Sequence, residues 1–363
     1  MSLRVETPRG HDDLIEFLEF HDTVYEHRSA RHLEFLPLSL PVLMGESPFT
    51  VGREVRPFLA RRNGEPAARV VAAIDERYQA LWNELLGHLL LFEALPEALD
   101  ESRAVLDGAC EWLRERGATA ARAGMGMLEF PFVIDDYESL PPLGVRQNPP
   151  WYHRFLKDAG FELEKGLVDY KIEVTPELIA RYELALEEAV SAGYEIVPLC
   201  DVPEKRRRRE FAALYNETFR SHWGWSPFTE EDLALLLEMQ AGLGALETSV
   251  IAYRRGEPAG VLWVAPEASA FARLGKGRVL RPDEKVNFLG IGVRRAERGR
   301  GLNLGMASYA YLELIRRGAT WLSYTMVLDD NWPSRRTAEK LGARACANYV
   351  VYRRNFTMVP RAA

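Results

Sequence analysis

The sequence predicts an α/β fold with a mixed, partly parallel sheet, built twice along the chain. Strand-like apolar runs alternate with helix-periodic segments, and strand–helix–strand units of this kind imply parallel pairing. The length of 363 residues fits two domains of roughly 100–200 residues each. Three short tracts recur in the same order: Gly-Glu-Pro-Ala at Gly64 and Gly256, Arg-Gly-Ala-Thr at Arg116 and Arg317, and a helix-ending glycine at Gly160 and Gly342.

The first half reads as a strand-rich unit that opens with a hairpin. Asn63-Gly64 is a strong two-residue turn signal between the two strands of that hairpin. Gly117 and Gly160 each end a helix, and a proline-rich loop covers 130–150. The expected elements are a hairpin at 55–74, a strand at 89–92, a helix at 104–116, a helix at 151–159 and a strand at 168–174.

A helix is expected to join the two halves. Thr175 is an N-cap candidate, Pro176 suits the first helical position and Gly193 supplies a stop. We therefore divide the chain into 1–174, a linker helix at 175–193, and 194–363. The expected elements of the second half are strands at 194–199, 288–293, 321–328 and 348–353, a hairpin at 250–264, and helices at 205–219, from 231, from the loop to Gly318, and at 333–341.

The composition is that of an ordinary globular chain, with 47% hydrophobic and 27% charged residues. A net charge of −7 gives no reason to expect a nucleic-acid partner. The three cysteines are isolated, and no histidine or cysteine pair has metal-ligand spacing, so we expect neither a disulfide nor a metal. No apolar run reaches the ~18 residues of a membrane helix, and the start lacks a signal-peptide core, so we expect a cytoplasmic protein without a membrane span. Whether the chain forms a homodimer is left open.

The stretch 286–318 runs from a short apolar strand through a loop rich in glycine and arginine into an apolar helix. Unpaired backbone N–H groups and the helix dipole make such a helix start a phosphate site. Nearby arginines add charge that suits a polyphosphate, at Arg294, Arg295, Arg298 and Arg300. A tight turn whose glycines only allow φ > 0 remains an alternative. A dinucleotide loop is less well matched because Leu304 stands where its third glycine belongs, and a Walker loop is excluded because no Gly-Lys-Ser/Thr follows.

The segment Arg298-Gly-Arg-Gly-Leu-Asn303, followed by Asn331-Trp-Pro-Ser-Arg-Arg-Thr-Ala-Glu-Lys-Leu-Gly342, resembles the coenzyme-A-binding half of the GNAT N-acetyltransferase superfamily. Asn303 departs from the pattern, which has a small residue there. The resemblance covers nearly all of 194–356 and implies acetyl-CoA or another acyl-CoA as co-substrate. It also implies the cofactor-binding residues Ile291, Val293, Arg298, Gly299, Arg300, Gly301, Leu302, Asn303, Leu304, Gly305, Asn331 and Ser334.

The chain further resembles a group of bacterial tandem GNAT proteins of poorly defined role. The matching pieces are Asn216 to Thr229, Leu328-Asp-Asp-Asn331, Asn148-Pro-Pro-Trp-Tyr152 and Gly160-Phe161. In the first half, the position of the phosphate loop is taken by Leu95-Pro-Glu-Ala-Leu-Asp-Glu-Ser102, which lacks glycine and arginine and is acidic. We therefore expect the first copy to be degenerate and not to bind coenzyme A.

The catalytic groups are less well defined than the loop. The resemblance implies a tyrosine acid four residues before Gly342, but Ala338 stands there, so we consider Tyr324 or Tyr309 unless these are packed aromatics. It also implies a carboxylate base near the strand before the loop, where the sequence has none. We prefer Asp330 because strand C-termini border the cleft in such sheets, although it could simply cap the next helix. The other carboxylates considered are Asp283, Glu284 and Asp329.

The aromatic loop 221–228 is where the resemblance places the acceptor. Two tryptophans and a histidine are costly to leave in water, so His222, Trp223 and Trp225 either pack inward or bind a ligand. The sequence thus suggests an N-acyltransferase that passes an acetyl or longer acyl group from CoA to an amine of a small-molecule or lipid-like acceptor. The alternative is a non-catalytic acyl-CoA or small-ligand binding protein.

Overall fold

The computed structural model describes residues 2–28, 36–127, 129–139, 147–265, 278–281 and 286–356. The expected order of elements along the chain is confirmed, and the first copy has further elements that the sequence analysis did not assign: the helices α1, α2 and α3 and the short strands β1, β5 and β6. The first copy consists of β1 (Leu3–Glu6), α1 (His11–Tyr25), α2 (Leu36–Met44), β2 (Arg53–Arg62), β3 (Glu65–Asp75), α3 (Glu76–Trp82), β4 (Leu86–Ala94), α4 (Leu99–Glu115), β5 (Ala120–Ala123), β6 (Phe132–Val133), α5 (Trp151–Asp158) and β7 (Glu162–Glu173).

The second copy follows through the expected linker helix. The side chain of Thr175 accepts a hydrogen bond from the backbone N–H of Leu178, so Thr175 is the N-cap that its position predicts. The elements are α6 (Pro176–Ser191), β8 (Tyr194–Pro198), α7 (Glu204–Phe219), α8 (Glu230–Gly242), β9 (Val250–Arg254), β10 (Glu257–Ala265), β11 (Asn287–Val293), α9 (Leu302–Arg316), β12 (Trp321–Leu328), α10 (Trp332–Lys340) and β13 (Arg344–Asn355).

The strands form two sheets, of nine and four strands. The larger has the order β1-β2-β3-β4-β5-β13-β7-β12, with β6 paired to β13, and the smaller has the order β11-β10-β9-β8. Within the described residues, β4 and β5 pair in parallel, while the other ladders are antiparallel. The mixed, partly parallel sheet expected from the sequence is therefore confirmed.

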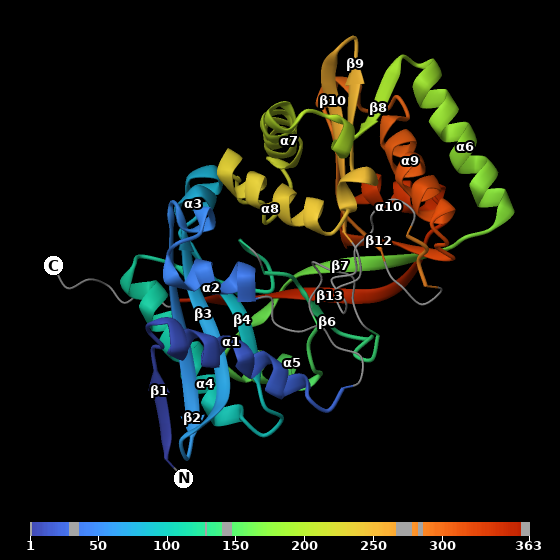
Figure 1. Cartoon of the computed structure of the whole chain (residues 1–363). Coiled ribbons are helices and arrows are strands. Elements are labelled where there is room, and N and C mark those ends of the chain that lie inside the picture. The colour runs from blue at the N-terminus through green and yellow to red at the C-terminus, as the bar shows by residue number, and fades with distance from the viewer. Residues whose placement is uncertain are drawn as a thin grey trace.

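The two copies exchange their last strands. β13, which ends the second copy, lies against β5 of the first copy, and β7, which ends the first copy, lies against β12 of the second. Figure 1 shows β7 and β13 running together through the middle of the molecule. The larger sheet contains strands from both sides of the boundaries at 174 and 193. The division of the chain at these residues therefore describes the linear sequence and stays a prediction.

The hydrophobic core of each copy contains residues of the strand that comes from the other copy. Ile172 of β7 is buried in the core of the second copy, beneath α6 and α9, while Tyr352 of β13 is buried in the core of the first copy, beside α4 and α5. A third apolar cluster joins the copies, because it contains Phe17 and Leu90 from the first and Phe211 and Trp263 from the second. The copies therefore share buried surface as well as strands.

The sheet arrangement opens a space in the second copy. β11 is the edge strand of the smaller sheet, whereas β12, which follows it along the chain after α9, is the edge strand of the larger one. In the first copy the corresponding strands β4 and β5 stay paired from Leu86 to Leu89. The separation of β11 from β12 is the feature of the fold that positions the candidate site.

Candidate functional site

A large cavity lies between β11 and β12 and extends into the first copy. Its volume is about 1330 Å³, above the roughly 300–1,000 Å³ of a usual small-ligand site. The wall contributed by the second copy includes Gly290 to Val293 of β11 and Tyr324 to Leu328 of β12. The wall contributed by the first copy includes His21, Leu91 and Glu93. The cavity is therefore built by both copies, which their sequences taken separately did not indicate.

The glycine loop opens onto this cavity. Gly299 and Gly301 have φ of 79° and 81°, a left-handed conformation that favours glycine. A side chain built on either residue would meet no atom within 4 Å, so the space in front of the loop is open. Gly301 is the N-cap of α9 and supplies no side-chain cap, and the first residues of the helix, Leu302 to Leu304, line the cavity. Their backbone N–H groups have no partner inside the helix and are suited to an anion.

Basic side chains surround the loop, and of the four arginines that the sequence suggested, Arg298 alone lines the cavity. Arg298 lines the cavity and donates from Nε to the carbonyl oxygen of Val293 at 3.1 Å. Arg336 and Lys340 of α10 also line it, and the sequence analysis did not name them. Arg294 instead pairs with Glu217, with Nε 2.9 Å from its carboxylate. Arg300 lies beside Glu297 and is absent from the cavity wall.

Two other expected cofactor residues have structural contacts that explain their presence. Asn303 donates from Nδ2 to the hydroxyl of Thr337 at 3.0 Å, which ties the start of α9 to α10. Gly305 does not line the cavity: a Cβ there would lie 2.4 Å from the Cβ of Ala189 on α6. Gly305 therefore allows α6 and α9 to pack closely, and the proposed cofactor contact does not fit its position.

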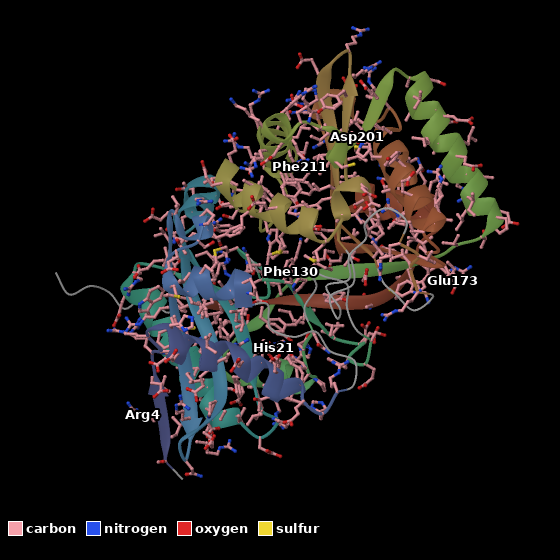
Figure 2. The ribbon with its side chains drawn as sticks, in the orientation of Figure 1. Arg4, His21, Phe130, Glu173, Asp201 and Phe211 are labelled. Carbon is pink, nitrogen blue, oxygen red and sulfur yellow. The ribbon has the colours of Figure 1, made fainter. Side chains whose placement is uncertain are left out.

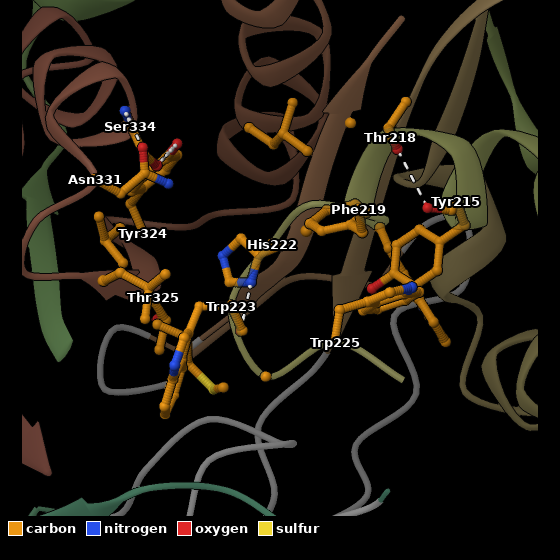
Figure 3. Close-up of a pocket in the computed structure, with 18 of the residues that line it drawn as sticks. Tyr215, Thr218, Phe219, His222, Trp223, Trp225, Tyr324, Thr325, Asn331 and Ser334 are labelled. Atoms are coloured by element: carbon orange, nitrogen blue, oxygen red, sulfur yellow. Dashed lines mark hydrogen bonds between the residues drawn. The ribbon is translucent and has the colours of Figure 1, made fainter. Parts of the chain in front are cut away.

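Four of the expected cofactor-binding residues, on β11 and at the start of α10, do line the cavity: Ile291, Val293, Asn331 and Ser334. Asn331 caps α10 by accepting the backbone N–H of Ser334 at 3.3 Å. The hydroxyl of Ser334 lies 3.0 Å from the Tyr324 hydroxyl. Figure 3 shows Asn331, Ser334 and Tyr324 together on one side of the cavity.

The two catalytic candidates lie on the same wall in different electrostatic settings. Tyr324 is buried, and this burial raises the pKa of its phenol, so the hydroxyl stays protonated at neutral pH. Asp330 is 62% exposed and pairs with Lys165, and that hydrogen bond holds the pKa of the carboxyl below its usual range. A carboxylate with a lowered pKa is a weaker base, which counts against the role expected for Asp330. Tyr309 does not line the cavity, and Asp283 and Glu284 lie outside the described residues.

The aromatic loop faces the cavity and also packs. Trp225 stacks on Phe219, with ring centroids 5.3 Å apart, and lies close to Tyr215 and Phe228. The Trp223 ring lies under the Arg122 guanidinium of β5 at 4.4 Å. Both tryptophans and His222 also line the cavity, so the inward packing raised by the sequence is confirmed, while binding of a ligand by these residues stays a prediction.

His222 is held in a single tautomer. Its Nδ1 lies 3.1 Å from the carbonyl oxygen of Trp223, and since a carbonyl only accepts, Nδ1 must carry the proton. Nε2 of the neutral ring then bears a lone pair. Burial lowers the pKa of His222, and the Trp223 carbonyl and Asp330 only partly offset this, so the ring is neutral at pH 7. In Figure 3, His222 is drawn between Tyr324 on one side and Phe219 on the other.

The first copy anchors the aromatic loop through a buried ion pair. Arg53 donates from Nε to Asp75 at 2.8 Å and from Nη2 to the Ser226 hydroxyl at 3.1 Å, and Ser226 donates to Asp75 at 2.6 Å. Burial alone would raise the pKa of Asp75, but the Arg53 charge and the Ser226 hydroxyl outweigh it and leave the pKa lowered. The indole N–H of Trp82 also donates to the Trp225 carbonyl at 2.7 Å. The first copy thus positions the aromatic loop 221–228.

The first copy also supplies polar groups to the cavity wall that the sequence analysis missed. His21, Glu93, Glu129 and Gln147 are all buried and all line it. A sequence signal did exist for one of them, because Glu93 is a lone charge in the apolar run Leu89-Leu-Leu-Phe-Glu-Ala94. Figure 2 labels His21 within the first copy, beneath Phe130.

The described part of the chain contains neither a cluster of metal-ligating side chains nor a helix suited to cross a membrane. There, no three histidine, cysteine or acidic side chains gather as a metal site would require. The helices in that part are also too short or too polar to cross a membrane.

Comparison with known proteins identifies the fold. No family model matches the chain. It is 22% identical over 186 residues to the protein YghO of Escherichia coli, whose length it covers to 46%, about half. It is 21% identical over 331 residues to a bacterial ceramide synthase of Caulobacter vibrioides, covering 84% of this chain and 85% of that one.

Among solved structures, a tandem GNAT protein from the clavulanic acid biosynthesis pathway superposes with a TM-score of 0.62 at 13% identity, covering 99% of this chain and 100% of that one. A GCN5-related glucosamine N-acetyltransferase region of a fungal multi-domain β-N-acetylglucosaminidase superposes with a TM-score of 0.60 at 17% identity, covering 97% of this chain and 38% of that one. At such identities the likeness shows the fold alone, and it agrees with the fold that the sequence predicted.

Proposed function

We propose that this chain, which has the tandem GNAT fold, is an acyl-CoA-dependent N-acyltransferase with one donor site, in the second copy. The observation that carries the proposal is the uncapped start of α9, which opens through Gly299 and Gly301 onto the cavity between β11 and β12. A diphosphate matches this place, because unpaired N–H groups and the positive helix end favour an anion. Arg298, Arg336 and Lys340 supply positive charge around it.

The edge of β11 gives the rest of the donor a place to bind. β11 is an edge strand, so its outer backbone groups are not used by a neighbouring strand of its own sheet. Gly290 and Gly292 let α7 pack against the strand, since a Cβ on them would meet Phe219 and Thr218 at 2.9 and 2.1 Å. An extended amide chain laid along this edge would bring the thioester between β11 and Tyr324.

The reaction we propose is a direct transfer. The acceptor enters as an ammonium, and Nε2 of His222 takes one proton to free the amine lone pair. The amine nitrogen then bonds to the thioester carbon, the carbon–sulfur bond breaks, and the amide nitrogen loses a second proton. Tyr324, whose pKa is raised by burial, gives its proton to the leaving thiolate and recovers one from solvent or from the amide nitrogen.

The acceptor is proposed to be a lipid-like amine. The cavity is larger than an acetyl group and a small amine require, and one part is lined by aromatic and aliphatic side chains from both copies. These are Leu38, Leu91, Phe219, Trp225, Phe228, Leu236, Met239 and Trp263. The similarity to a bacterial ceramide synthase over most of both chains supports a long aliphatic substrate.

Titration calorimetry with acetyl-CoA, palmitoyl-CoA and free coenzyme A tests the donor claim, and free-thiol release across short and long amines tests the transfer. We expect one coenzyme A per chain and thiol release that is fastest with a long-chain amine. Each methylene buried should tighten binding by about 0.8 kcal/mol, or roughly fourfold. Absence of binding by every donor would overturn the proposal, and binding without thiol release would favour the non-catalytic alternative.

A further inference from the structure

One wall of the cavity carries a buried phenol that the transfer reaction does not use. Tyr215 of α7 lines the cavity, and 6% of its surface is exposed. Within the described part of the chain, its hydroxyl has no hydrogen-bond partner. The buried hydroxyl of Tyr182, in contrast, donates to the carbonyl oxygen of Leu341 at 2.6 Å. An unpaired hydroxyl is costly to bury, so the Tyr215 phenol is a candidate to bind a group from outside the protein.

A second unpaired donor belongs to the neighbouring ring. The centroid of the Trp263 ring, on β10, lies 5.6 Å from that of Tyr215, in an edge-on arrangement. Trp263 is buried and lines the cavity, and its Nε1 finds no acceptor among the residues that the structure describes. An indole N–H only donates, and burial raises the pKa of Tyr215, so its phenol is protonated at neutral pH and also donates. Both groups therefore call for an oxygen that accepts.

The same cavity wall also offers an acceptor. Gln240 of α8 is buried and lines the cavity, and its Oε1 has no donor within the described ranges of the chain. The wall thus holds two unpaired donors and one unpaired acceptor. A hydroxyl group matches such a wall, because it both accepts and donates, whereas a keto oxygen only accepts.

The surroundings favour a neutral group over an ion. The rings in contact with Tyr215 are all aromatic: Phe211, Phe219, Trp225, Phe228 and Trp263. A carboxylate placed among these rings would lose its hydration without gaining a partner of opposite charge, which costs far more free energy than burying a hydroxyl group. An ammonium group would meet the donor hydrogens of Tyr215 and Trp263. A hydroxyl group has neither difficulty.

The phenol lies next to the strand that the donor is proposed to follow. A Cβ on Gly290 of β11 would lie 3.2 Å from the Tyr215 hydroxyl, and Gly290 lines the cavity. Gly290 comes three residues before Val293, about 10 Å farther from the glycine loop along the strand. A donor whose diphosphate lies at the loop would therefore bring its acyl end toward Gly290. Figure 3 shows His222 between Tyr215 and Tyr324, so the phenol is on the side of the reacting groups.

The neighbours of Tyr215 hold its ring in place. Phe211 stacks on it, with centroids 5.4 Å apart and an angle of 19° between the planes. Trp225 lies edge-on at 5.1 Å, and its carbonyl oxygen accepts the indole N–H of Trp82 from the first copy at 2.7 Å. The hydroxyl therefore has a fixed position, which a preorganised binding site requires.

We propose that Tyr215 and Trp263 form a polar subsite that binds a hydroxyl group on an otherwise aliphatic substrate, close to the new amide bond. This inference rests on the proposed function for the identity of the two substrates. Two aliphatic chains meet at this place, the acyl group of the donor and the chain of the amine acceptor, and the hydroxyl group belongs to one of them. The subsite makes the hydroxylated substrate the preferred one of its class.

The test compares two pairs of substrates that differ by one hydroxyl group. The donor pair is palmitoyl-CoA and 3-hydroxypalmitoyl-CoA, each with hexadecylamine, and the acceptor pair is hexadecylamine and 1-amino-2-hexadecanol, each with palmitoyl-CoA. We expect one pair to show a preference of about tenfold to a hundredfold in kcat/KM for the hydroxylated member, because its analogue leaves buried polar groups unpaired. The pair that shows this preference identifies the substrate that carries the hydroxyl group.

Tyr215→Phe removes the hydroxyl and keeps the ring. This variant should reduce the preference to about threefold or less and should not lower the melting temperature, because no described residue loses a hydrogen bond. Tyr182→Phe is the matched control: it leaves the Leu341 carbonyl unpaired, so it should lower the melting temperature by about 2–4 °C and keep the full preference. An unchanged preference in Tyr215→Phe would overturn the inference, as would the absence of a preference in both substrate pairs.

Binding measured without turnover separates this inference from the proposed function. Calorimetry with each member of the two pairs, in the absence of the second substrate, reports the preference of the subsite directly. If no amine is acylated, the proposed function fails, but a binding preference for a hydroxylated ligand that Tyr215→Phe abolishes would still support the subsite. Equal affinities within both pairs for the wild-type protein would contradict it.

Discussion

The two copies share a fold but differ at the same point of it. In the second copy, α9 begins at a left-handed glycine with no side-chain cap, and β11 and β12 lie in different sheets. In the first copy, α4 begins after Ala98, Glu101 of its first turn is paired with Arg62, and β4 and β5 remain partly joined. The first turn of α4 thus carries the acidic residues Asp100 and Glu101, which disfavour a diphosphate at that helix start.

The backbones of β4 and β11 also differ, at the place where the register of each strand with its neighbour shifts. β4 has a left-handed residue at Leu91, with φ of 52°, and the N–H of that residue is occupied by the Glu129 carboxylate. β11 has a register shift at the corresponding place, opposite Trp263 and Val264. The comparison teaches that the second copy presents the open glycine loop proposed as the donor site, while the first copy anchors the aromatic loop and forms part of the cavity wall.

The largest expected effect comes from separating the copies. Chains 1–174 and 175–363, expressed alone, should fail to fold, because β5 would lose β13 and β12 would lose β7. Each buried apolar side chain lost costs about 1.5–3 kcal/mol, and several exceed the 5–15 kcal/mol that usually stabilises a domain. Near-UV circular dichroism and cooperative melting measure the fold, with co-expression of both chains as the control. A native-like half on its own would show that the strand exchange is dispensable.

Replacing the proposed base comes next. His222→Gln should lower kcat about 10²- to 10⁴-fold with a smaller change in KM. Because the pKa of His222 is lowered, the neutral form is complete at pH 7, and wild-type activity should fall only as pH drops below 6.5. The first copy offers a control in His153, whose two nitrogens are engaged by Tyr352 and Val133 away from the cavity. A pH profile unchanged by His222→Gln would remove this histidine from the mechanism.

Blocking the glycine loop tests which copy binds the donor. Gly301→Val should weaken coenzyme A binding about 100-fold or more, because the side chain would fill the open space and strain a left-handed backbone. Gly193→Val is matched, since Gly193 has φ of 86° and equally open surroundings but follows the linker helix. Calorimetry should report one site per chain in the control and none in Gly301→Val. Two sites, or retained affinity, would contradict the assignment of a single donor copy.

The smallest expected effect concerns surface charge at the loop. Arg298→Ala should weaken coenzyme A binding by about threefold to tenfold at low salt, and the difference should shrink above 0.5 M salt because exposed charges are screened. Arg294→Ala is the comparison, since Arg294 pairs with Glu217 and donates to the Pro258 carbonyl. Equal losses of coenzyme A affinity in the two variants would mean that these arginines attract the ligand through long-range charge and that Arg298 does not contact a defined phosphate.

Much of the fold and the donor loop could be predicted because their causes are local. Thr175, Pro176 and Gly193 define the linker helix through capping and backbone preferences, and Asn63-Gly64 defines a turn. Gly299 and Gly301 predicted the loop because glycine adopts positive φ values such as theirs more easily than other residues do. The proposed base, His222, could not be found in this way. His222 and Asp330 are far apart in sequence, and their different pKa shifts arise from burial and from Lys165, which the fold brings in from the first copy.

The sequence by itself indicated two GNAT-like copies, and it predicted one glycine loop suited to a diphosphate and an acidic segment at the same place in the other copy. These are properties of short segments, where residue type, spacing and backbone preference act together. Only the tertiary structure decided that the last strands are exchanged and that Gly305 serves helix packing. It alone brought His21 and Glu93 to the wall of the same cavity as His222 and Tyr324. Pairing of distant strands and burial of distant charges depend on the whole folded chain, and no single segment encodes them.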